Sequence, residues 1–264
     1  MKKIFSFLLL LLFLSALIEA QELSAYEYLV KGNNKFSSED YSGAIIDYSN
    51  SLLQDSLESA GQFDNDSLKT VILSKDTIKI NKTDVYYYIA ASKTHMGSFN
   101  EALSYYNKLI SIDSNYTNVF YNRGVVKFYL KDYKGALSDF DISIIRQPSL
   151  IESHEAKTII RMRDKKYESV IVEAGAGIAK SSIEYNLYYY RGLAKFYLYN
   201  YSEAVEDFNL AIENKPDFDK AYYNRGLSFY RLSKYSEACL DWEKADNLGY
   251  NKAGETLNEL CKQR

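Results

Sequence analysis

The sequence Tyr-Asn-Arg-Gly occurs at residues 121–124 and again at 223–226, and Tyr-Tyr-Arg-Gly occurs at 189–192. The glycines that end these stretches lie 68 and 34 residues apart, which is two periods and one period of 34 residues. One period before residue 124 lies Ala90, inside the similar run Tyr-Tyr-Tyr-Ile-Ala at 86–90. A fixed period of this length is typical of proteins built from repeated helical units.

The period divides most of the chain into six units. They span residues 25–58, 83–116, 117–150, 151–184, 185–218 and 219–252. Position 17 is aromatic in every unit: Tyr41, Phe99, Tyr133, Tyr167, Tyr201 and Tyr235. The chain's two prolines, Pro148 and Pro216, both fall at position 32, where a helix is expected to end. Residues that were not used to find the period therefore agree with it.

These residues resemble the tetratricopeptide repeat (TPR) family. The last unit carries the family's pattern at positions 4, 8, 17, 20, 24 and 27, as Tyr222, Gly226, Tyr235, Ala238, Trp242 and Ala245. The resemblance covers residues 25–252. It implies an all-α fold, a right-handed superhelical solenoid of six antiparallel helix pairs in which small residues let helices approach and aromatic residues fill the spaces between pairs.

Positions 7 and 23 change together from unit to unit. A base faces an acid in five units: Lys31 and Asp47, Arg123 and Asp139, Lys157 and Glu173, Arg191 and Asp207, and Arg225 and Asp241. In the second unit both are replaced, by Ile89 and Tyr105. Paired replacement implies contact, so we predict an ion pair between the two helices of five units and an apolar contact in the second unit. These pairs are expected to be structural.

Two segments depart from the pattern. The fourth unit, 151–184, is degenerate, because it has Thr158 at position 8 and two glycines in the run 173–177, inside its expected second helix. Those glycines are read either as a hinge or as tolerance of a weak repeat, and His154, at the aromatic position 4, as a core residue. A 24-residue insertion, 59–82, follows the first unit and contains a candidate short hairpin at 71–80.

The chain beyond the sixth unit is expected to cover the end of the stack. Residues 253–264 are predicted to form a capping helix, as solenoid ends require. Cys239 lies on the last unit's second helix and Cys261 on this cap. Their placement leaves two alternatives open, a disulfide bond in an oxidising compartment or two buried thiols.

The first 20 residues are expected to be a secretory signal peptide. Lys2 and Lys3 precede an apolar run from Ile4 to Ile18, and Ala20 offers a cleavage site. The run is shorter than the roughly 20 residues that span a bilayer, so an uncleaved anchor is the lesser alternative. The formal net charge of −3 becomes −4 without Lys2, Lys3 and Glu19, and it suggests neither nucleic acid nor an anionic membrane as a partner. We therefore expect an exported protein, periplasmic or secreted.

Residues that carry chemistry are scarce. The two histidines, His95 and His154, lie in different units, and no cysteine, histidine and carboxylate group has the spacing of metal ligands. No glycine-rich loop follows a strand, as a phosphate-binding loop would. The sequence therefore predicts no catalytic residue, no metal and no cofactor, and an enzyme is not expected.

The TPR resemblance places a partner on the concave face, formed by positions 2, 5, 9, 12 and 13 of each first helix. At positions 5, 12 and 13 this face would present Tyr87, Tyr121, Phe128, Tyr129, Tyr189, Phe196, Tyr197, Tyr223, Tyr230 and Arg231. Tyrosine and arginine are favoured at interaction hot spots. We expect a non-enzymatic scaffold or adaptor that binds another protein or peptide along this groove. Two alternatives stay open: a purely structural aromatic stripe, and a carbohydrate-binding module.

Overall fold

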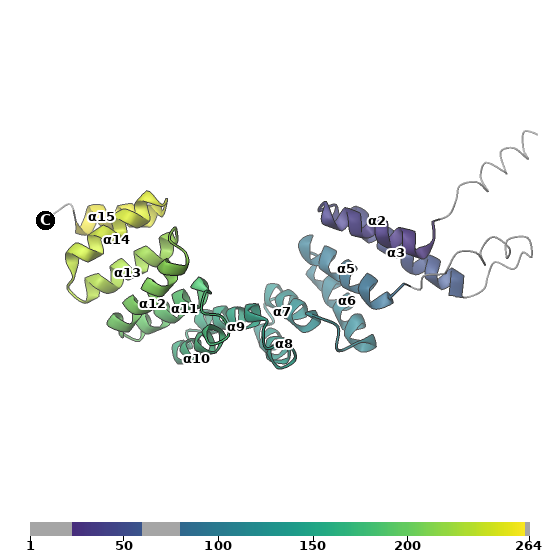
Figure 1. Ribbon diagram of the computed structural model, residues 1–264, viewed down its shortest axis with the longest axis horizontal. Helices are drawn as coiled ribbons and strands as arrows, with labels where there is room; N and C mark the ends of the chain where they lie inside the picture. Colours follow the sequence, from purple (N-terminus) through teal and green to yellow (C-terminus); the bar gives the residue numbers. More distant parts are fainter. Residues whose placement is uncertain (1–22, 60–79, 262–264) are drawn as a thin grey trace, which may run out of the picture. The chain divides into compact units, whose positions relative to one another are not determined.

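The computed structural model describes residues 23–59 and 80–261 (Figure 1). The chain divides into two compact parts after Val119. The first part contains two helix pairs, α2 (Ala25–Ser37) with α3 (Tyr41–Ser59) and α5 (Lys82–His95) with α6 (Phe99–Ile112). Its first helix opens with a capping box, in which the Ser24 hydroxyl accepts from the Glu27 amide and the Glu27 carboxylate accepts from the Ser24 amide at 2.8 Å.

The second part contains four helix pairs and a final single helix. The pairs are α7 (Val119–Tyr129) with α8 (Tyr133–Arg146), α9 (Ile151–Arg163) with α10 (Tyr167–Ile178), α11 (Tyr185–Tyr197) with α12 (Tyr201–Asn214), and α13 (Asp219–Arg231) with α14 (Tyr235–Asn247). The last helix is α15 (Asn251–Leu260). Every element of the described residues is helical and successive helices pack together within each part, which confirms the predicted all-α solenoid of helix pairs.

In four pairs a glycine of the first helix lies against a ring of the second helix. A Cβ placed on Gly192, at position 8, would lie 2.9 Å from the ring of Phe208, at position 24. Gly32, Gly124 and Gly226 meet Tyr48, Phe140 and Trp242 in the same way. In the fourth repeat the two sizes are exchanged, because position 8 is Thr158 and position 24 is Ala174, and both are fully buried. In this repeat the larger of the two side chains is therefore at position 8 and the smaller one at position 24.

Ion pairs join the helices of most repeats. Arg123 and Arg225 each donate two hydrogen bonds to the aspartate at position 23, and Arg191 donates three, with shortest distances of 2.6–2.7 Å. In repeat four Lys157 lies 2.6 Å from Glu173. In repeat two Ile89 and Tyr105 pack in one hydrophobic cluster.

The first repeat corrects this prediction. Asp47 pairs with Lys35 at 2.9 Å and not with Lys31. Lys35 is one helical turn further along, at position 11, and Lys127 and Lys195 at that position also reach the aspartate of their own repeat, at 2.8 and 3.0 Å. A lysine is long enough to reach the acid from either turn, so its spacing did not identify the partner.

The packing of the fourth repeat requires one of its two glycines. A Cβ on Gly177 would lie 2.5 Å from Leu187 of α11 and 3.0 Å from the Cβ of His154, whereas a Cβ on Gly175 would meet nothing within 4 Å. His154 is 6% exposed, as expected of a core residue, and its Nδ1 lies 2.6 Å from Glu173. The helix runs unbroken from Tyr167 to Ile178, so Gly177 serves close packing rather than a bend.

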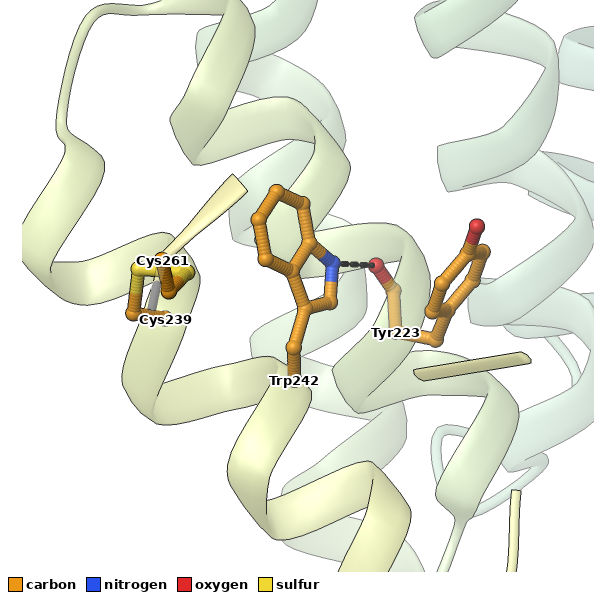
Figure 2. The surroundings of a disulfide bond; sticks show 4 residues. All are labelled: Tyr223, Cys239, Trp242 and Cys261. Carbon is orange, nitrogen blue, oxygen red and sulfur yellow. Dashed lines mark hydrogen bonds between the residues drawn. A yellow bond between two sulfur atoms is a disulfide. The ribbon is translucent and has the colours of Figure 1, made fainter. Parts of the chain in front are cut away.

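The cap is held by a disulfide bond. Cys239 in α14 and Cys261, directly after α15, have Cα atoms 6.0 Å apart and bonded sulfurs (Figure 2). The disulfide, rather than a pair of thiols, is therefore the alternative found in this structure. The cap begins at Asn251, two residues before the predicted start, because the turn that precedes it is short.

Several predictions concern segments outside the described residues. They are the signal peptide at 1–20, the hairpin predicted at 71–80, of which only Ile80 is described, and the end of the cap at 262–264. Within the described ranges, no helix has the length and apolarity to cross a bilayer.

Candidate partner-binding face

We use "helix-A face" for positions 2, 5, 9, 12 and 13 of the first helix of each pair, the surface on which the sequence places a partner. The tyrosines at position 5 are partly embedded in it. The ring centroid of Tyr189 lies 4.9 Å from that of Phe218 and 6.0 Å from that of Phe208, and its hydroxyl accepts a hydrogen bond from Asn224 at 3.2 Å. Burial accordingly raises the pKa of Tyr189.

Two further tyrosines at position 5 follow the same geometry. Tyr87 lies 6.3 Å from Tyr106 and 5.1 Å from Tyr116, and Tyr121 lies 5.9 Å from Phe140, measured between ring centroids. Each ring therefore packs on the position-24 ring of its own repeat, and each residue is half-buried. These residues combine the two roles that the sequence left open, filling the core and contributing to the face.

Tyr223 is the exception and corrects the prediction. It is 5% exposed, because α15 lies over it: the Tyr250 ring is 5.0 Å away and Thr256 is within 3.4 Å of its hydroxyl. The main-chain carbonyl of Tyr223 also accepts a hydrogen bond from the indole of Trp242 at 3.2 Å (Figure 2). Its position matches the other tyrosines, but the cap removes it from the accessible surface.

The aromatic residues at position 12 brace the turn between the two helices of a repeat. Phe128, Phe196 and Tyr230 each meet the position-17 tyrosine of their own repeat edge-on, with centroids 5.6, 5.3 and 5.2 Å apart. All three are half-buried. Their main contribution is to the core, and only part of each ring is available to a partner.

Position 13 is the most exposed part of the face. Tyr129 is 56% exposed, Tyr197 is 50% exposed, and Arg231 is also exposed. Tyr197 lies flat on Tyr167 of the preceding repeat, with ring centroids 5.0 Å apart and planes inclined by 13°. One face of Tyr197 is therefore occupied within the array, although the residue stays 50% exposed.

The stack between position 13 and the preceding position 17 recurs, and sequence reasoning missed it. His95 stacks on Tyr41 at 4.6 Å, and the Arg163 guanidinium lies 3.6 Å above the ring of Tyr133. A signal was present, because position 13 holds a flat, delocalised side chain in repeats two to six: His95, Tyr129, Arg163, Tyr197 and Arg231. Such side chains stack well on aromatic rings.

Repeat four changes the charge of the face. Glu155 occupies position 5, where the neighbouring repeats have tyrosine, and Glu152 lies one turn before it. Burial raises the pKa of Glu155, and the negative charges of Glu184 and Glu152 raise it further, against a hydrogen bond from Asn186. The start of α9 therefore places partly desolvated carboxylates beside Tyr121, whose pKa burial and these acids raise.

The described residues contain no candidate metal site. No three histidine, cysteine, aspartate or glutamate side chains in residues 23–59 and 80–261 are grouped as metal ligands would be. The aromatic edges, hydroxyl groups and exposed guanidinium of the helix-A face suit contacts to an extended or helical segment of another chain.

Comparison with known proteins agrees with the fold. The tetratricopeptide repeat family matches residues 84–115, one repeat of the chain. No curated protein matches the sequence. Among solved structures, a MamA double mutant is similar with a TM-score of 0.60 and 21% identity, covering 66% of this chain and 97% of that one.

Two further structures are similar over comparable lengths. MamA from residue 41 onward of Desulfovibrio magneticus RS-1 has a TM-score of 0.59 and 22% identity, covering 64% of this chain and 96% of its own. YrrB, described as a TPR protein with an unusual peptide-binding site, has a TM-score of 0.54 and 17% identity, covering 70% and 93%. At these identities the likeness concerns the fold. The family match at residues 84–115, the 34-residue register and the helix pairs together support a tetratricopeptide repeat protein.

Proposed function

We propose that this protein is a non-enzymatic scaffold that binds a peptide or a segment of another protein along the helix-A face. The observation that carries the proposal is the surface formed by the residues at position 13 and the half-buried tyrosines at position 5. Tyr129, Tyr197 and Arg231 are exposed there, and Tyr121 and Tyr189 are half-buried. Large, stiff side chains with a polar end give much contact area at low cost in conformational entropy.

The rigidity of these side chains supports the proposal. Tyr197 is held by its stack on Tyr167, and Tyr189 by contacts to Phe208 and Phe218. A partner therefore meets side chains whose rotamers are already restricted, so that less ordering accompanies binding. A known TPR protein of similar fold, YrrB, is described as having a peptide-binding site, and we propose a ligand of the same class for this chain.

The site of action proposed with this function is the cell envelope. The basic start, the apolar run and Ala20 support export to the periplasm or the exterior. Fractionation of the native host and Edman sequencing of the purified protein would test this. A mature chain that begins at Gln21 is expected, and a cytosolic protein that retains Met1 would contradict export.

The binding proposal is tested by site-specific photocrosslinking. A benzophenone amino acid is placed at Tyr129 or Tyr197 on the helix-A face, or at Ile145 or Val172, which are 78% and 74% exposed on second helices of repeats, as matched controls. After irradiation in native envelopes, crosslinked peptides are identified by mass spectrometry. One partner peptide recovered from both face positions and from neither control is expected. Equal crosslinking at all four positions would contradict a defined binding face.

A glycan array separates the carbohydrate alternative. Tyr223 is buried and Tyr189 is half-buried, so sugar stacking would depend on Tyr129 and Tyr197. We expect that the wild-type protein binds no glycan through Tyr197, so that the array signals of the wild type and of Tyr197→Ala are the same. A glycan bound by the wild-type protein and lost in this variant would favour the carbohydrate-binding function over the peptide-binding one.

A further inference from the structure

The last helix, α15, takes the place that a seventh repeat would give to its first helix. Ala253 is fully buried against the preceding pair, as Leu187 of α11 and Ala221 of α13 are in their repeats. Tyr250, just before α15, packs on Tyr223 as Phe218, just before α13, packs on Tyr189. The cap therefore imitates a repeat without completing one.

Its packing is slight compared with that of a true repeat helix. Among its residues 251–260 only Ala253 is buried, whereas Leu257 and Leu260 are partly covered. The helix α11, by contrast, buries four residues, Leu187, Tyr188, Gly192 and Ala194. A helix of 10 residues has little stability on its own, so contacts to α14 and the disulfide must hold the cap.

The disulfide fastens the free end of this helix. It joins Cys261, which follows α15, to Cys239 of α14, and both residues are partly exposed, so an attacking thiolate can reach the sulfurs. Tyr223 lies against Thr256 of α15, and its main-chain carbonyl accepts a hydrogen bond from Trp242, which is fully buried (Figure 2). The bond therefore holds α15 against Tyr223, which is the only buried tyrosine at position 5 in the described repeats.

We propose that the Cys239–Cys261 disulfide is a redox latch that keeps α15 closed over the last repeat, and that its reduction exposes Tyr223 and Trp242. The reductant is a dithiol. Its thiolate attacks one sulfur to form a mixed disulfide, and its second thiol displaces the protein. Two electrons and two protons end on Cys239 and Cys261 as thiols, and the reductant becomes a disulfide.

The expected size of the effect follows from the length of chain that the bond closes. When α15 detaches from a folded α14, the freed segment between the end of α14 and Cys261 has about a dozen residues, and tying its ends together removes an entropy equivalent to roughly a hundredfold in the opening equilibrium. Reduction should therefore raise the open fraction of the cap about a hundredfold while the preceding helices keep their own packing.

Trp242 makes the latch measurable, because it is the chain's single tryptophan. The full-length protein is compared with and without dithiothreitol, by hydrogen exchange with mass spectrometry and by acrylamide quenching of tryptophan emission. Reduction is expected to speed amide exchange in residues 251–260 about a hundredfold, with exchange in α12 unchanged, and to make Trp242 more accessible to quencher. The test needs no binding partner, so its outcome is independent of the proposed scaffold function.

Variants guard against side effects of the reductant. Cys261→Ser and Cys239→Ser should each reproduce the reduced wild-type protein without any thiol added. In the oxidised protein, Leu257→Ala weakens only the packing of α15. Reduction of this variant should still cause a large further increase in amide exchange of residues 251–260. If both thiols titrate as free while exchange in α15 rises less than threefold, packing alone closes the cap and there is no latch. Equal acceleration in α12 would make the bond a staple of the whole repeat, which also overturns the proposal.

Discussion

Two glycines in α10 lie two residues apart and have opposite surroundings. A Cβ on Gly177 would be 2.5 Å from the Cδ1 of Leu187, which is fully buried, and 3.0 Å from the Cβ of His154. A Cβ on Gly175 meets nothing within 4 Å. The substitutions Gly175→Ala and Gly177→Ala therefore add the same methyl group to the same helix, and only one of them has to displace neighbours.

The magnitudes follow from two opposing effects. Alanine is favoured over glycine inside a helix by up to about 1 kcal/mol, and this gain applies to both sites. Overpacking a filled core costs about 1–3 kcal/mol, and this cost applies to Gly177 alone. We expect Gly175→Ala to raise the free energy of unfolding by up to about 1 kcal/mol. Gly177→Ala should lie about 1–3 kcal/mol below Gly175→Ala, because the helix term nearly cancels between them.

Urea unfolding followed by circular dichroism gives the comparison. Solenoids can lose repeats separately, so the m-values of both variants must match that of the wild-type protein before free energies are compared. Equal stabilisation by the two substitutions would refute the reasoning, since it would mean that the contact between α10 and Leu187 does not restrict position 177. Equal stabilisation would also favour the interpretation that both glycines are merely tolerated in a weak repeat.

Three further predictions follow from the buried polar and small-residue contacts. Arg225→Ala should cost about 3 kcal/mol in urea unfolding at pH 7, and Arg191→Ala less, because Asp207 keeps Lys195 at 3.0 Å. Burial acts to raise the pKa of Glu173, but hydrogen bonds from His154 and Lys157 leave this pKa lowered. The difference in free energy of unfolding between wild type and Glu173→Gln should therefore be full above about pH 4.3 and decrease toward pH 3. A difference that does not change with pH would contradict this. Ala174→Phe should destabilise repeat four, and adding Thr158→Gly should recover at least about 1 kcal/mol in a double-mutant cycle; strictly additive effects would refute the exchange of volumes.

The helix pairs were predictable from the sequence because a repeated unit must satisfy the same local and neighbouring contacts each time. The ring at position 17 and the prolines after α8 and α12 mark helix boundaries, and the structure places helices there. The charge pairs at positions 7 and 23 were accessible for the same reason, since two residues that change together contact each other. Repeat one shows the limit, because Lys35 reaches Asp47 from a neighbouring turn.

The face was harder to predict than the fold. The stacked residues at positions 13 and 17 belong to different repeats. The contact of Tyr197 with Tyr167 therefore depends on how neighbouring helix pairs pack against each other. The face also depends on what lies over each repeat. Tyr189 and Tyr223 occupy the same position in the repeat, yet one is half-buried and the other is covered by the cap.

The sequence by itself determined the period and the helix pairs, because these depend on local residue type repeated at fixed spacing. Only the tertiary structure decided which tyrosines a partner can reach, which lysine meets Asp47 and that Cys239 meets Cys261. Those outcomes depend on which helix packs next to which. The physical reason is that a solenoid residue is buried by its neighbours along the stack, and the last repeat has a different neighbour from all the others.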